Sequence, residues 1–201
     1  MRAAVFLNGS PDPPDLLRRV AARADLVVAA DGGALHALAA GIVPELVVGD
    51  MDSLGDEGTR RIEARGASLE RHPAKKDKMD GHLAVLAARK RGATDLDLLC
   101  ATGGRPGAVF ALPHLLLAAE RMGVRATVAA GWGEMFVVES GSRTVAGGPG
   151  ERRLRLPSLR RGRGRHPGRF RVPIGGCHSR GRRHCGVPQR VARGGGQGGR
   201  E

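Results

Sequence analysis

Residues 26–53 read LVVAADGGALHALAAGIVPELVVGDMDS and contain two short apolar runs on either side of a helical pattern. The runs Leu26–Ala30 and Leu46–Val48 consist only of Leu, Val and Ala, a composition typical of strands that are buried on both faces. Between them, the residues Ala34–Ala40 predict a short helix that ends at Gly41. Strand, helix and strand in this order predict a parallel sheet that is covered by helices.

The same alternation continues on both sides of this stretch. Further strands are predicted at residues 3–7, 96–100 and 124–130, and further helices at residues 14–23, 56–65, 79–90 and 113–122. The whole pattern predicts an α/β fold with a Rossmann-like parallel sheet and helices on both faces.

The pattern changes after residue 130, and we divide the chain accordingly. Residues 1–130 are expected to form the α/β domain. Residues 131–151 include an apolar run at 135–138 that predicts a strand, as expected for the start of a small β-rich domain. Residues 152–201 form a tail that is rich in Arg and Gly and has no periodic apolar face, so we expect most of it to be disordered.

The basic charge of the chain is concentrated in this tail. Residues 152–201 contain 15 arginines and one acidic residue, a net charge of +14, whereas the whole chain carries +13. Residues 1–151 are therefore nearly neutral, as expected of an ordinary globular domain. The tail alone favours nonspecific binding of nucleic acid, although it has few aromatic side chains to stack on bases.

Cysteine usage and hydropathy point to a cytoplasmic protein without a membrane span. Three cysteines make no disulfide framework, and no stretch of eighteen apolar residues is present. The apolar run at residues 5–7 is too short for a signal peptide. The pairs Cys177-His178 and His184-Cys185 could bind zinc, but their spacing is not a common one, and chance placement is the simpler interpretation.

Two polar motifs directly follow predicted strands. The turn at residues 31–34, Asp-Gly-Gly-Ala, could let a phosphate or ribose approach backbone N–H groups, or it could be an ordinary tight turn. In the segment 49–53, Asp50 and Asp52 are two residues apart and could point at one hard cation such as Mg²⁺. The same segment could instead be an acidic loop that caps the next helix.

Two further motifs carry charged groups. Asp77 and Asp80 are three residues apart at a predicted helix start, beside lysines that suit a polyphosphate, although Asp77 could simply be a helix cap. The loop Gly103-Gly104-Arg105 offers backbone donors and a guanidinium to an anion, or it is a turn with a surface arginine. The ends of parallel strands share one edge of the sheet, so we expect the motifs at residues 31–34, 49–53 and 103–105 to form one site.

Taken in order, these motifs resemble those of the thiamine pyrophosphokinase family, over about residues 3–150. The family has Asp-Gly-Gly-Ala, Gly-Asp-x-Asp-Ser, Lys-Asp-x-Thr-Asp and Gly-Gly-Arg segments, which correspond here to residues 31–34, 49–53, 76–80 and 103–105. The resemblance implies transfer of pyrophosphate from ATP to the hydroxyl of thiamine, giving thiamine diphosphate and AMP. It also implies Mg²⁺ between the phosphates and the aspartates, and a homodimer if the C-terminal domain is intact.

The resemblance also implies roles for particular residues. The metal would be held by Asp50, Asp52 and Asp77, and the catalytic set would add Asp80. The residues expected to hold the nucleotide are Asp31, Gly32, Gly33, Ala34, Ser53, Lys76, Gly103, Gly104 and Arg105.

The sequence departs from the family at several places. Gly107 and Ala108 replace an Asp-His pair, Leu112 replaces an Asn, and Met79 replaces a Thr. The family ends in a small β-domain that helps to bind thiamine, whereas here an Arg- and Gly-rich tail follows. That composition is typical of a GC-rich gene read out of frame, and we hypothesise a frameshift near residues 151–153. The alternatives are an inactive relative of the family and a protein that binds nucleic acid through its tail.

Overall fold

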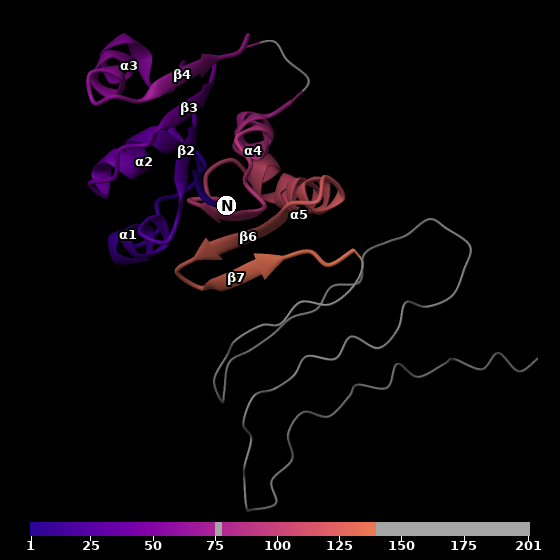
Figure 1. Cartoon of the computed structure of the whole chain (residues 1–201). Coiled ribbons are helices and arrows are strands. Elements are labelled where there is room, and N and C mark those ends of the chain that lie inside the picture. The colour runs from indigo at the N-terminus through magenta and orange to yellow at the C-terminus, as the bar shows by residue number, and fades with distance from the viewer. Residues whose placement is uncertain (75–77, 140–201) are drawn as a thin grey trace, which may run out of the picture. The chain divides into compact units, whose positions relative to one another are not determined.

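The computed structural model describes residues 1–74 and 78–139, which build a seven-stranded sheet with helices on both of its faces (Figure 1). The strands are β1 (Arg2–Phe6), β2 (Leu26–Ala30), β3 (Leu46–Gly49), β4 (Ser68–Arg71), β5 (Asp95–Leu99), β6 (Arg125–Ala130) and β7 (Gly133–Phe136). The helices are α1 (Pro14–Ala21), α2 (Gly33–Ala39), α3 (Gly55–Glu63), α4 (Asp80–Lys90) and α5 (Pro106–Arg121). The predictions made for Lys76, Asp77 and the basic tail lie outside the described residues.

The sheet has its topological switch point at β1: strands are added on one side of β1 first and on its other side afterwards. The order is β4-β3-β2-β1-β5-β6-β7, and all neighbours are parallel except β6 and β7, which are antiparallel. The chain builds the sheet outward from β1 to β4 and then returns to the other side of β1 with β5. In parallel α/β sheets, ligands bind beyond the carboxyl ends of the strands at such a switch point.

Two apolar clusters hold the layers together. Figure 1 shows α1, α2 and α3 on one face of the sheet and α4 and α5 on the other. Val5 and Phe6, neighbours in β1, belong to opposite clusters, because successive strand residues point to opposite faces. Val5 packs in the cluster that includes Leu116 of α5, and Phe6 in the one that includes Leu17 of α1. Burying a side chain the size of Phe6 stabilises the fold by about 1.5–3 kcal/mol.

The α/β fold predicted from the sequence is confirmed, with differences at its margins. Strand β4 was not predicted, because its sequence Ser-Leu-Glu-Arg lacks an apolar run and the strand lies at the edge of the sheet. Helix α5 begins at Pro106, well before the predicted start at Pro113, which lies inside the helix. The strand predicted at 135–138 forms at 133–136 and pairs with β6. The division into domains at residues 130 and 151 stays a prediction.

Polar groups are rare in the buried parts of the sheet. Asp97 of β5 is 5% exposed, and the Arg2 guanidinium binds its carboxylate through two hydrogen bonds of 2.6 and 2.8 Å. This two-point contact raises the pKa of Arg2 and compensates the burial of the carboxylate. Within the described residues, none of the helices combines the length and the apolar character needed to span a membrane.

Replacing Gly33 by alanine should destabilise the fold. A Cβ atom on Gly33, the first residue of α2, would lie 2.3 Å from the carbonyl oxygen of Phe6. Helix and strand would have to move apart, and we expect a loss of about 1–3 kcal/mol in the free energy of unfolding. Gly107→Ala is the matched control, because Gly107 also lies in the first turn of a helix, but among the described residues nothing beyond its chain neighbours and its own helix backbone lies within 4 Å of its Cβ position. Thermal denaturation should show a lower Tm only for Gly33→Ala; equal Tm values would contradict the close packing.

Candidate active site

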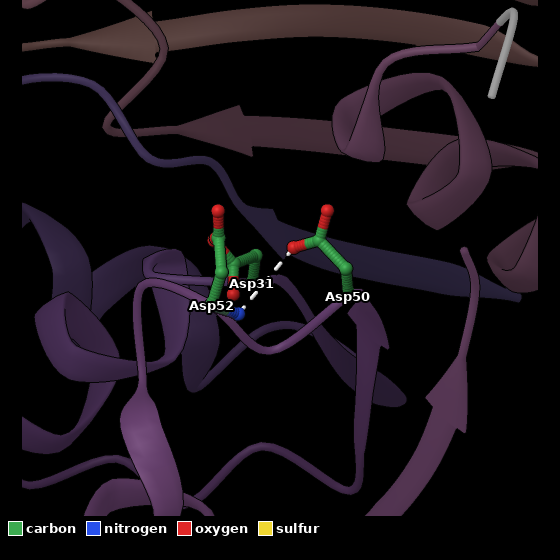
Figure 2. A group of neighbouring side chains, drawn as sticks. All are labelled: Asp31, Asp50 and Asp52. Atoms are coloured by element: carbon green, nitrogen blue, oxygen red, sulfur yellow. Dashed lines mark hydrogen bonds between the residues drawn. The ribbon is translucent and has the colours of Figure 1, made fainter. Parts of the chain in front are cut away.

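Three carboxylates meet where β2 and β3 end. Asp31 follows β2 directly, Asp50 follows β3, and Asp52 lies in the turn before α3. One carboxylate oxygen from each lies within 4.8 Å of the others, and Figure 2 shows the three side chains grouped together. The backbone N–H of Asp52 also points at Oδ1 of Asp50, at 3.4 Å. This spacing puts three hard oxygen ligands within reach of a single divalent cation.

The three carboxylates differ in burial, and Asp31 is the innermost. Asp31 is 4% exposed, Asp50 is half-buried and Asp52 is exposed. Burial raises the pKa of Asp31, hydrogen bonds from Ser53 and the Gly32 backbone act in the opposite direction, and the negative charge of Asp52 raises it further. Oδ1 of Asp31 is buried and has no hydrogen-bond partner among the described residues. A cation at this point would satisfy the buried oxygen and offset the repulsion, so the residues fit a divalent metal.

The backbone is unusual at the same edge of the sheet. Asp31, Met51 and Cys100 adopt left-handed conformations with φ of 44°, 68° and 51°, and each lies one or two residues after a strand. Such conformations are unfavourable for residues other than glycine and persist only where the surroundings enforce them, often at functional sites. Their position supports placing the site at this edge.

Asp80 adds a fourth carboxylate beside Asp31. It is the first residue of α4, where a negative charge interacts favourably with the helix dipole. A Cβ atom on Gly49 would lie 2.9 Å from Cβ of Asp31 and 3.3 Å from Oδ1 of Asp80. Gly49, the last residue of β3, thus lies against both acidic residues, and a side chain there would collide with Asp31.

The loop between β5 and α5 lies at the same edge and rests on the loop after β1. The N–H of Gly9 donates to the carbonyl of Cys100 at 2.8 Å, and the N–H of Ser10 donates to the carbonyl of Thr102 at 2.7 Å. Gly103 and Gly104 are exposed and have φ of 75° and 66°. Arg105 is exposed immediately before α5. The backbone donors and the guanidinium predicted for anion binding are thus accessible.

Of the other residues that were predicted to hold the nucleotide, the three in the turn after Asp31 are buried and Ser53 is exposed. Ala34 is fully buried in the apolar cluster beneath α2, and Gly33 lies against β1. Gly32 lies against the side chain of Asn8, and Ser53 is exposed beside Asp52. The nucleotide-binding roles of these residues stay predictions.

Sequence reasoning missed two polar residues in the loop that follows β1. The carboxylate of Asp12 accepts a hydrogen bond from the N–H of Cys100 at 2.8 Å and another from the N–H of Gly131 at 3.0 Å, so it ties this loop to the ends of β5 and β6. The amide of Asn8 donates to Oγ of Ser53 at 3.2 Å. The only signal in the sequence was the position of these polar residues just after the first strand.

Comparison with known proteins gives a consistent result for this part of the chain. Residues 17–128 match the family model described as thiamin pyrophosphokinase, catalytic domain. This range contains the three clustered carboxylates as well as Asp80 and Arg105. Thiamine pyrophosphokinase of Bacillus subtilis (strain 168) is 35% identical to the chain over 80 residues, which are 40% of this chain and 37% of that protein.

Solved structures share the same fold. The thiamine pyrophosphokinase structure from Bacillus subtilis superposes with a TM-score of 0.52 at 25% identity, covering 64% of this chain and 60% of that one. A thiamin pyrophosphokinase family protein from Enterococcus faecalis gives a TM-score of 0.52 at 29% identity, covering 63% and 61%. The chain thus spans just over a third of the curated relative that it matches and about three fifths of these two structures.

Proposed function

This chain belongs to the thiamin pyrophosphokinase family, and from that membership we propose that it transfers pyrophosphate from ATP to the hydroxyl group of thiamine, giving thiamine diphosphate and AMP. The observation that carries the proposal is the coincidence of two findings. The segment that matches the family, residues 17–128, is also the segment that brings Asp31, Asp50 and Asp52 together at the edge where α/β sheets bind ligands.

A divalent cation such as Mg²⁺ belongs to this proposal. Asp31, Asp50 and Asp52 would hold it, and the unpartnered oxygen of Asp31 supports this assignment. When bound, the cation would neutralise negative charge on the phosphates of ATP. Asp31 thereby takes a place in the metal set that the sequence had given to Asp50, Asp52 and Asp77, and Asp77 remains a predicted member.

The chain's own residues would act mainly by positioning and by charge. Gly103 and Gly104 would present backbone N–H groups to the phosphates, and the Arg105 guanidinium would balance their charge. Holding ATP and thiamine in line lowers the entropy cost of bringing the two reacting groups together. Such positioning is a main contribution of the protein to phosphoryl-type transfer. Asp80, beside Asp31, would complete the acidic wall of the site.

The remaining parts of the proposal rest on the resemblance and on composition. If the C-terminal domain is intact, we propose a homodimer, with thiamine bound in part by the β-rich segment that begins near residue 131. A cytoplasmic location agrees with three cysteines that make no disulfide framework. With that domain intact, sedimentation velocity of the full chain should give twice the monomer mass of 21.1 kDa.

Thiamine-dependent release of AMP tests the proposed activity. The full chain is incubated with ATP and Mg²⁺, with and without thiamine, and the nucleotides and thiamine diphosphate are separated by chromatography. We expect AMP and thiamine diphosphate to form in equal amounts, and only when thiamine is present. Release of AMP without thiamine, or no product from a folded protein that binds ATP, would contradict the proposal; the second result would identify an inactive relative.

A further inference from the structure

Asn8 begins a chain of hydrogen bonds that ends at the acidic cluster. It lies two residues after β1, at the switch point of the sheet. Its Nδ2 donates to Oγ of Ser53 at 3.2 Å, and Oγ of Ser53 donates to Oδ1 of Asp52 at 3.2 Å. This relay of hydrogen bonds, from Asn8 through Ser53 to Asp52, connects a residue that follows β1 with a carboxylate that follows β3.

The chemistry of the relay gives it a direction. The amide nitrogen of Asn8 can only donate, so the Ser53 oxygen must accept from it. A hydroxyl group has one proton, and with its oxygen engaged by Asn8 that proton is left for a carboxylate. Without Asn8, the hydroxyl would be free to rotate.

The exposed side chain of Asn8 lies against the turn that follows β2. A Cβ atom on Gly32 would lie 2.6–2.7 Å from the atoms of the Asn8 amide group, so the amide lies directly over the turn that follows β2. The same amide donates to Ser53, after β3. Asn8 therefore connects the ends of β1, β2 and β3, the three strands whose ends surround the acidic cluster.

We propose that Asn8 is a positioning residue of the cation site: its amide fixes the direction of the Ser53 hydroxyl and, through that hydroxyl, the carboxylate of Asp52. Groups that orient metal ligands in this way typically change metal affinity by about 10- to 100-fold when they are removed. The inference rests on the proposed function, because it requires a cation at Asp31, Asp50 and Asp52.

Binding of Mn²⁺, measured by electron paramagnetic resonance on the full chain without substrates, tests this role. We expect Asn8→Ala to weaken Mn²⁺ binding about tenfold and Ser53→Ala to weaken it at least as much. The double variant should bind no more weakly than Ser53→Ala, since Asn8 acts through Ser53. Ser68→Ala, on the exposed edge strand β4, is the matched control and should bind like wild type.

The outcomes separate this inference from the proposed function. If wild type binds Mn²⁺ but Asn8→Ala binds equally well, or if the two single effects add, Asn8 does not position Asp52 and the cation site stands. If wild type binds no Mn²⁺, the cation site itself fails, and the inference fails with it.

Nuclear magnetic resonance gives a second readout that a merely structural role would not move. Asn8 is the only asparagine in the sequence, so selective labelling yields a single side-chain amide pair. We expect this pair to shift when Mg²⁺ is added to wild type and to stay unchanged in Ser53→Ala. The relay would be overturned if wild type binds Mg²⁺ without a shift of the Asn8 amide signals. It would also be overturned if these signals still shift in Ser53→Ala.

Discussion

An Asp52→Ala variant should lose thiamine-dependent AMP release, with a rate at least about 100- to 1000-fold below that of wild type. Alanine removes one of the three clustered carboxylates and also the acceptor of the Ser53 hydroxyl. Asp52 is exposed and is outside both apolar clusters, so the free energy of unfolding should change by less than about 0.5 kcal/mol. The measurement is AMP formed per enzyme per minute, together with Tm.

Asp56→Ala is the matched control for this loss. Asp56 is an exposed carboxylate in the first turn of α3, four residues further along, and it is not in the cluster. Its replacement should leave the rate close to that of wild type. Turnover like wild type in Asp52→Ala would remove Asp52 from the site and leave the family assignment unaffected.

An Asp31→Asn variant should be more stable than wild type without metal and at the same time bind Mn²⁺ at least tenfold more weakly. Asparagine keeps the shape of the side chain and tolerates the left-handed backbone at this position, so no new strain is introduced. It removes a negative charge that is buried, close to Asp52 and left with one unpartnered oxygen. The same charge is what a cation would bind, so stability and function are expected to change in opposite directions.

The pH dependence of Tm tests whether the buried negative charge of Asp31 causes this difference in stability. The pKa of Asp31 is raised in the folded protein, so the folded state binds the proton more tightly than the unfolded state. Protonated Asp31 therefore contributes stability that is present below its pKa in the unfolded chain and is lost as the pH rises through its pKa in the folded protein. In the presence of a chelator, the Tm advantage of Asp31→Asn should therefore grow from acid to neutral pH. A variant that melts below wild type, or a difference that is constant with pH, would contradict this explanation.

The sequence predicted the layers of this fold well because its central strands are continuous runs of Val, Leu and Ala. It failed where an element lies at an edge or begins with residues typical of loops. Strand β4 is half exposed and lacks an apolar run, and α5 begins with Pro106-Gly107, which reads as a turn. Proline fits the first turn of a helix, because an N–H at that position would have no partner within the helix. The start predicted for α5 was late because Pro106 reads as part of a turn and not as the first residue of the helix.

The candidate site was predictable in its location but not in its details. Asp31, Asp50 and Asp52 were placed at one edge because the ends of parallel strands meet there, whereas Asp80 was added by the resemblance to the family. The burial of Asp31 and its closeness to Asp50 and Asp52 depend on packing that no local pattern shows. The contact between Asn8 and Ser53 joins residues 45 positions apart, and it becomes visible only when the three strands are aligned in space.

The central place of β1 has a consequence for how the chain acquires its structure. Strand β1 is made before the other six strands of the sheet and lies in its middle, and its Arg2 pairs with Asp95 of β5. Parallel pairing over so long a separation raises the contact order and slows folding, because the long loop must close before the contact forms. Until β5 leaves the ribosome, one edge of β1 stays unpaired and open to pairing with other chains. Fragments that end before residue 95 should therefore aggregate, and a nascent chain of that length would benefit from a chaperone.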